Sequence, residues 1–125
     1  MSCRLAALFI IALLMTSCGG RSDEPVMCTL IACSDGITVE LQGNVPANYT
    51  VTARAGSEAR SHECSQAQPC GPIMFENFTP DRVAIEITSA AGTVRREVTP
   101  EYRTVRPNGP NCPPECRQAR VIVTL

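Results

Sequence analysis

Eight cysteines and a single histidine are the residues in this 125-residue chain whose chemistry could define its role. Two of the cysteines, Cys3 and Cys18, lie among the first twenty residues. Thiols can cross-link a fold, bind a metal, exchange electrons or carry a covalent group. The sequence around each cysteine therefore has to distinguish these uses. The other six form three close pairs along the chain: Cys28 and Cys33, Cys64 and Cys70, and Cys112 and Cys116.

The N-terminal segment predicts export from the cytoplasm. One positive charge, Arg4, precedes an unbroken apolar run over residues 5–15. That run is too short to cross a bilayer, which takes roughly 20 residues. A charged start, a short apolar middle and small residues at its end are typical of a secretory signal peptide.

The stretch M-T-S-C at residues 15–18 resembles the lipobox of bacterial lipoproteins, with two small residues before a cysteine. The resemblance implies that residues 1–17 are a lipoprotein signal peptide. It also implies that Cys18 receives a diacylglyceryl group and, after cleavage, a further acyl chain such as palmitate. Two or more acyl chains suffice for stable anchoring without a transmembrane helix. The alternative is an ordinary secretory signal that contains a cysteine by chance.

The residues after Cys18 imply a location and a domain division. Gly19 stands where an Asp would favour the inner membrane of enteric bacteria, so the resemblance implies the outer membrane. We expect residues 18–27 to be the lipidated N-terminus and a flexible tether, because they are polar and begin with glycines. Residues 28–125 are then the folded domain.

The six remaining cysteines of an exported chain predict three disulfides, for which 15 connectivities exist. Cys64 and Cys70 flank a loop short enough for them to bond each other. The other four precede the first and last predicted strands. If those strands run side by side in parallel, Cys33 meets Cys116 and Cys28 meets Cys112. An antiparallel arrangement would favour other partners.

Metal and redox chemistry are the rival uses of these cysteines. His62, Glu63, Cys64 and Cys70 could form a metal-ligand set, but the chain contains no C-x-x-C unit of the kind that zinc sites use. The Cys112-x3-Cys116 spacing is one residue longer than that of a thioredoxin-type site. We therefore expect no metal and no other cofactor.

The candidate catalytic residues in this sequence lack the neighbours that catalysis would need. A Ser-His-Asp arrangement would have to use His62, which has no nucleophile elbow beside it. Glu97 and Glu101 offer carboxylates, but neighbouring guanidinium groups favour a solvated, salt-bridged face. Those groups belong to Arg95, Arg96 and Arg103. We expect a protein that is not an enzyme.

The charge balance bears on possible partners. The formal net charge is −1, and it becomes −2 when Arg4 leaves with the signal peptide. Because no basic block occurs, nucleic-acid binding has no electrostatic support. The sequence predicts contact with a membrane through the N-terminal lipid and leaves open a protein partner in the envelope.

Residues branched at Cβ outnumber Leu in the mature chain, and such residues favour strands over helices. Apolar and polar residues alternate repeatedly, whereas no stretch has a helical period. The pattern predicts an all-β domain of about seven strands. The expected strands cover residues 37–42, 49–55, 82–89, 93–102 and 120–125, with weaker candidates at 57–63 and 73–78.

Three longer stretches are similar to small cysteine-containing lipoproteins of high-GC bacteria such as myxobacteria: CTLIACSDGITVEL, YTVTARA and YRTVRPNGPNCPPECRQARV. This resemblance implies an immunoglobulin-like or transthyretin-like β-sandwich and no particular activity. We expect a lipid-anchored envelope protein that serves as a non-catalytic binding or structural module. The alternative is a periplasmic metal- or redox-handling protein that uses His62 and the cysteines.

Overall fold

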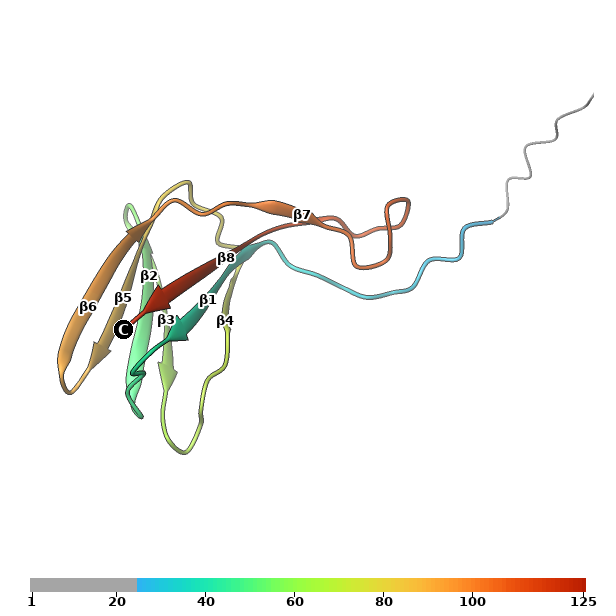
Figure 1. The fold of residues 1–125 in the computed structure, drawn as a ribbon. Helices are drawn as coiled ribbons and strands as arrows, with labels where there is room; N and C mark the ends of the chain where they lie inside the picture. The colour runs from blue at the N-terminus through green and yellow to red at the C-terminus, as the bar shows by residue number, and fades with distance from the viewer. Residues whose placement is uncertain (1–24) are drawn as a thin grey trace, which may run out of the picture.

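A computed structural model describes residues 25–125, so the predicted signal peptide and Cys18 lie outside the described residues. The described chain is all-β and forms a sandwich of two four-stranded sheets, which confirms the predicted fold class (Figure 1). We call β4-β1-β8-β7 the terminal sheet and β3-β2-β5-β6 the hairpin sheet. Their strands are β1 (Gly36–Gln42), β2 (Tyr49–Ala55), β3 (Glu58–Cys64), β4 (Ile73–Glu76), β5 (Val83–Ser89), β6 (Gly92–Val98), β7 (Arg103–Val105) and β8 (Cys116–Thr124).

The described residues contain eight strands, whereas the sequence predicts about seven. The difference arises between residues 93 and 105. The alternation there predicts one strand over 93–102, but β6 ends at Val98, just before Pro100. Proline removes a backbone donor and interrupts the ladder. The chain then crosses to the other sheet and adds β7, a three-residue strand too short for alternation to reveal.

The alternating apolar residues meet between the two sheets and form the core. The predicted strands at 37–42, 49–55, 82–89 and 120–125 place buried residues there, because successive side chains of a strand point to opposite faces, whereas β6 is only half-buried at Val94 and Val98. The largest fully buried side chains include Phe78, which follows β4 outside any strand. The strand residues of this core cluster are Ile37, Val39, Val51, Ala53, Cys64, Ile73, Phe75, Val83, Ile85, Ile87, Val121 and Val123.

The first and last strands lie side by side and run parallel. Ile37 pairs with Ala119 and Val39 with Val121 along the β1–β8 ladder. On the other edge of β1, the antiparallel strand β4 passes very close to Gly36. Gly36 has a φ of 152°, and a Cβ there would lie 2.2 Å from the carbonyl oxygen of Phe75. Glycine is therefore required where β4 meets the start of β1.

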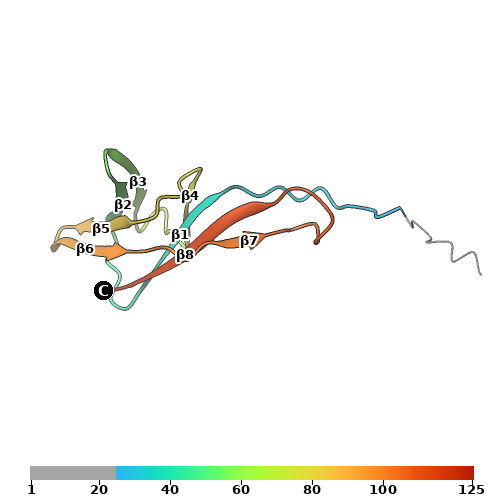
Figure 2. The ribbon, with the colours of Figure 1, turned by 90° about the horizontal axis from the view of Figure 1, so that it is seen from above.

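An arm projects from the sandwich at the end where β1 and β8 begin (Figures 1 and 2). It consists of residues 25–35 lying beside the loop 106–115, and β7 leads into that loop. The C-terminus lies at the opposite end of the sandwich. Residues 28–35 thus belong to the arm, and the sandwich itself begins at Gly36. No helix among residues 25–125 is long and apolar enough to cross a membrane.

Candidate functional site

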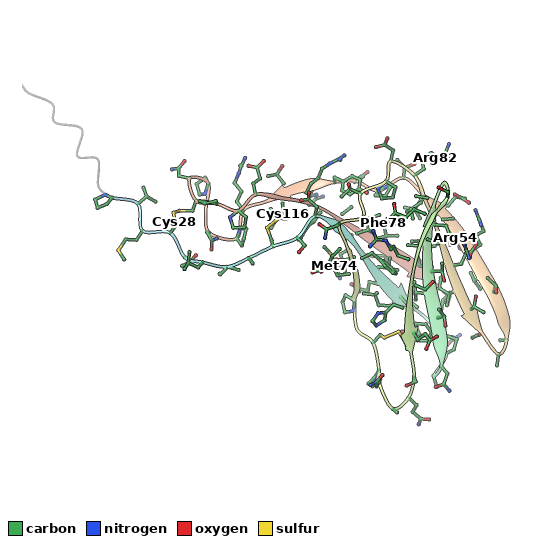
Figure 3. All side chains as sticks on the ribbon, turned by 180° about the vertical axis from the view of Figure 1, so that it is seen from behind. Cys28, Arg54, Met74, Phe78, Arg82 and Cys116 are labelled. Carbon is green, nitrogen blue, oxygen red and sulfur yellow. A yellow bond between two sulfur atoms is a disulfide. The ribbon has the colours of Figure 1, made fainter. Side chains whose placement is uncertain are left out.

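The structure joins the six predicted cysteines as three disulfides. Cys28 bonds Cys112, Cys33 bonds Cys116, and Cys64 bonds Cys70, with Cα–Cα distances of 5.6, 6.1 and 5.5 Å. This is the pairing that parallel first and last strands predict, and β1 and β8 are parallel. The first two disulfides tie the two sides of the arm together. Figure 3 shows Cys28 toward the far end of the arm and Cys116 at its base.

The proposed metal ligands come together only in part. One ligand atom each of His62, Cys64 and Cys70 lies within 4.8 Å of the others. Glu63 is not in this group, because the next residue along β3 points to the opposite face. Cys64 and Cys70 are bonded to each other, so neither sulfur is a free thiolate. A metal would require this disulfide to be reduced first.

The geometry of Cys112 and Cys116 does not match a dithiol redox pair. Each is bonded to a cysteine on the other side of the arm rather than to its neighbour in sequence. Both sulfur-bearing residues are also buried, with 8% and 5% of their surface exposed. A thiolate that attacks another disulfide has to be accessible. These residues are cross-links in the described structure.

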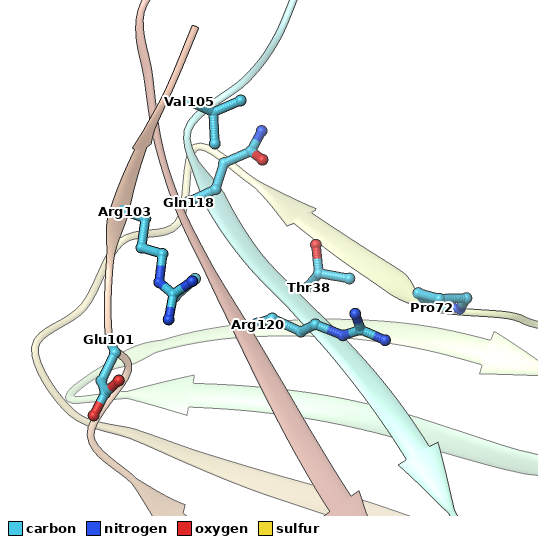
Figure 4. Close-up of a pocket in the computed structure, with 8 residues that line it drawn as sticks. Thr38, Pro72, Glu101, Arg103, Val105, Gln118 and Arg120 are labelled. Atoms are coloured by element: carbon cyan, nitrogen blue, oxygen red, sulfur yellow. The ribbon is translucent and has the colours of Figure 1, made fainter. Parts of the chain in front are cut away.

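A surface concavity of about 540 Å³ lies on the outer face of the terminal sheet (Figure 4). Cross-strand pairing explains why its polar groups converge: Thr38 stands opposite Arg120, and Gln118 stands opposite Arg103. Residues directly opposite each other share a face of the sheet. The lining residues are Thr38, Pro72, Glu101, Arg103, Val105, Gln118, Ala119 and Arg120.

The two arginines of the concavity have different surroundings. Arg120 lies across β1 in Figure 4 and forms an ion pair with Glu40. Hydrogen bonds from Arg120 and Gln42 hold the pKa of Glu40 below its ordinary value. Arg103 is directed from β7 toward β8 and has no ion pair among residues 25–125. Its guanidinium is therefore available for an anionic group from outside the described chain.

Tyr102 fixes the segment that carries Arg103. Its hydroxyl donates a 2.7 Å hydrogen bond to the carbonyl oxygen of Pro80, and the Arg117 guanidinium lies 4.2 Å from its ring centroid. Burial raises the pKa of Tyr102 above its ordinary value, partly offset by the Arg117 charge. The neutral phenol is thus the form that holds the entry to β7 against the sandwich.

The expected salt-bridged face exists on the hairpin sheet and includes Arg95 and Glu97, but not the other residues predicted for it. Arg95 binds Glu97 at 2.6 Å and Glu86 at 2.7 Å, and Arg54 binds the other oxygen of Glu86 at 2.8 Å. Hydrogen bonding to Arg54, together with Arg95, lowers the pKa of Glu86. Of the other residues predicted for this face, Arg96 donates only to a backbone carbonyl. Glu101 and Arg103 lie instead in the concavity.

Sequence reasoning did not identify the concavity as a site. Arg103 lies on β7, which the alternation does not reveal. Thr38 and Arg120 occupy outward positions of predicted strands, so the outward direction of these two side chains could have been predicted. Their proximity could not, because it depends on β8 lying between β1 and β7. Neighbour relations between strands far apart in sequence are not encoded in local alternation.

Comparison with known proteins adds no assignment: no protein-family model, curated protein or solved structure matches this chain.

Proposed function

We propose that this protein is a lipid-anchored module of the bacterial cell envelope, held in the outer membrane, that binds or supports another envelope component without catalysing a reaction. The observation that carries the proposal is M-T-S-C at residues 15–18 directly after the apolar run 5–15. That order supplies a thiol for acylation at the point where a signal peptide would be cleaved. Stable attachment needs no transmembrane helix when two or more acyl chains are present.

The disulfides support a location outside the cytoplasm. All six cysteines of residues 25–125 are cross-linked. Disulfides form and persist in oxidising compartments such as the periplasm and the cell surface, and they are rare in the cytoplasm. Two of the three close chain segments of more than eighty residues, which suits a stable exported domain.

The position of the arm supports a role in display. Residue 25 lies at the far end of the arm, away from the sandwich and the C-terminus (Figure 1). A lipid at Cys18 would therefore hold the molecule by one end and leave both outer sheet faces clear of the membrane. The concavity on the terminal sheet is the face we assign to partner binding, because Arg103 offers an unpaired guanidinium there.

Replacing Cys18 tests the anchor. In Cys18→Ser the hydroxyl offers no thiolate for acyl transfer, so we expect an unprocessed, larger precursor in place of the lipidated mature chain. Intact mass and detergent-phase partitioning of the protein expressed in a Gram-negative host measure both outcomes. Cys3→Ser is the matched control, since it removes the other leader cysteine and should process normally. Normal processing and partitioning of Cys18→Ser would overturn the proposal.

The convergence of His62 with two sulfur atoms favours one second candidate, a periplasmic metal- or redox-handling protein. This role requires the Cys64–Cys70 bond to open under periplasmic conditions. Thiol titration of the denatured, non-reduced protein separates the two candidates. Six blocked cysteines in the folded domain support the structural role. A free pair at Cys64 and Cys70, with zinc binding that is lost in His62→Ala, would support the second candidate.

A further inference from the structure

The arm exposes apolar side chains that the rest of the described molecule hides. Met27 and Leu30 are 95% and 98% exposed, and Val26 and Ile31 are 65% and 55% exposed. We call these four residues the apolar tip. In the remainder of residues 25–125, the exposed large apolar side chains are only Val45 and Ile122. Four exposed large apolar side chains within six residues concentrate apolar surface on the arm, and such surface marks contact with something other than water.

A disulfide and the side chain of Asn108 attach the apolar tip to the arm. The Cys28–Cys112 disulfide lies between Met27 and Leu30 in sequence and fixes them against the loop 106–115. The side-chain amide of Asn108 pairs with both backbone polar groups of Ile31, accepting from its N–H at 2.9 Å and donating to its carbonyl at 2.8 Å. Asn108 also donates to the Pro113 carbonyl at 2.7 Å. The exposure of the tip is therefore built into the arm.

The position of the tip in the chain identifies what covers it. Val26 lies eight positions after Cys18, and a fully extended chain of that length spans at most about 28 Å. If Cys18 carries acyl chains, Val26 at the start of the tip remains within that distance of the bilayer. The ion pair in the adjoining loop, between Arg106 and Glu115, is internally neutral. The tip thus offers apolar contact without charge attraction, which suits the interfacial zone of a membrane.

From these observations we infer that the apolar tip is a second membrane contact, which inserts beside the acyl chains and sets the orientation of the sandwich on the bilayer. The inference rests on the proposed lipid anchor and adds to it a defined protein–lipid surface. Under this arrangement the arm stands on the membrane with the loop 106–115 behind the tip. The concavity and the salt-bridged hairpin sheet then face away from the lipid headgroups.

A single tryptophan reports this contact, because the chain has no Trp of its own. Leu30→Trp places the probe in the tip, and Ile122→Trp places a matched probe at another exposed apolar position, on β8 of the sandwich. Each full-length protein is expressed, processed and reconstituted into phosphatidylcholine vesicles with or without brominated acyl chains. We expect the Leu30→Trp emission to be blue-shifted and mostly quenched by bromine. The Ile122→Trp emission should change little.

The outcomes separate the inference from the proposed anchor. Intact mass of the same samples reports whether Cys18 is lipidated. Strong quenching of Leu30→Trp that persists at high salt supports the inference, because apolar contact is not screened. An unquenched Leu30→Trp in a lipidated, vesicle-bound protein overturns the inference and leaves the anchor intact; it would indicate that a protein partner covers the tip. Equal quenching of both probes would also overturn it, since the tip would then have no special orientation.

Discussion

The sandwich buries its apolar side chains between two sheets, whereas the arm carries apolar side chains on its surface. Ile37, Val39 and Ile85 in the sandwich are 0% exposed, while Met27 and Leu30 in the arm are almost fully exposed. Burial of apolar surface is the main favourable term in folding. The arm lacks that term, so its order has to come from another source.

Disulfides and polar contacts keep the arm ordered. The two disulfides of the arm connect cysteines 84 and 83 positions apart, whereas the one in the sandwich connects cysteines 6 positions apart. Hydrogen bonds of Asn108 and of Asp35, which accepts from the Arg117 N–H at 2.6 Å, complete the arm. The comparison shows that one chain can use a hydrophobic core for its body and covalent bonds for a projection whose apolar side chains are exposed.

Removing both arm disulfides should have the largest effect. The first closes a loop of more than eighty residues, for which chain entropy gives about 4–5 kcal/mol. Once the long loop is closed, the second disulfide closes only a small ring made of residues 28–33 and 112–116. Chain entropy gives about 2–3 kcal/mol of further stability for that ring. A variant with all four cysteines changed to Ser should therefore lose about 7 kcal/mol, most of the stability typical of a small domain. Urea unfolding of the oxidised proteins measures the loss.

Two matched variants sharpen this expectation. The pair Cys28→Ser/Cys112→Ser should lose only about 2–3 kcal/mol, because Cys33–Cys116 still closes the long loop. The pair Cys64→Ser/Cys70→Ser should lose about 2 kcal/mol, because its loop is short. If the fourfold variant were no less stable than either double variant, the arm disulfides would not stabilise the protein by closing the long loop.

A core substitution should come next in size. Ile85 is fully buried in β5, so Ile85→Ala should cost about 2–5 kcal/mol through lost burial and the cavity left behind. Leu30→Ala in the arm and Ile122→Ala on the outer face of β8 should each change stability by no more than about 0.5 kcal/mol. Urea midpoints measure all three. A large loss of stability in Leu30→Ala would mean that the apolar tip contributes to folding. That result would contradict the contrast between the arm and the sandwich.

Loss of the Asn108 contacts should loosen the arm and leave the sandwich unchanged. Asn108→Ala removes the acceptor for the Ile31 N–H, a bond with a net value of about 0.5–1.5 kcal/mol. Amide exchange at Ile31 should then speed up roughly 2- to 12-fold. Exchange at core amides such as that of Ile85 should not change. Asn111→Ala is the control, since Asn111 is exposed on the same loop; equal acceleration in both variants would contradict the assigned role.

The smallest effect concerns the ion pairs on the hairpin sheet. The folded-state pKa of Glu86 is lowered by Arg54 and Arg95, so its contribution is present above the unfolded pKa of about 4.5. That contribution is lost as the pH falls through the lower folded-state value. Glu86→Gln should therefore melt slightly below the parent protein at pH 7, and the gap should close by pH 3. Thermal melting at both pH values measures it, and a gap that widens in acid would contradict the assignment.

The sequence by itself determined the strand faces. Ile37 and Val39, and likewise Val121 and Val123, alternate with polar or outward residues in the predicted strands and are buried, because side-chain direction in a strand follows a local period of two. The six cysteines that follow the predicted signal peptide likewise indicated disulfides without any knowledge of the fold. These features depend on neighbouring residues or on composition alone.

Only the tertiary structure decided which distant segments meet. The parallel pairing of β1 with β8 brings together the cysteines of the arm, and the insertion of β8 between β1 and β7 assembles the concavity around Arg103 and Arg120. The exposure of Met27 and Leu30 was also decided by the tertiary structure, since a sequence of apolar residues beside a cysteine is equally consistent with burial. Contacts between residues some eighty positions apart form only when the whole chain closes on itself, so no local pattern encodes them.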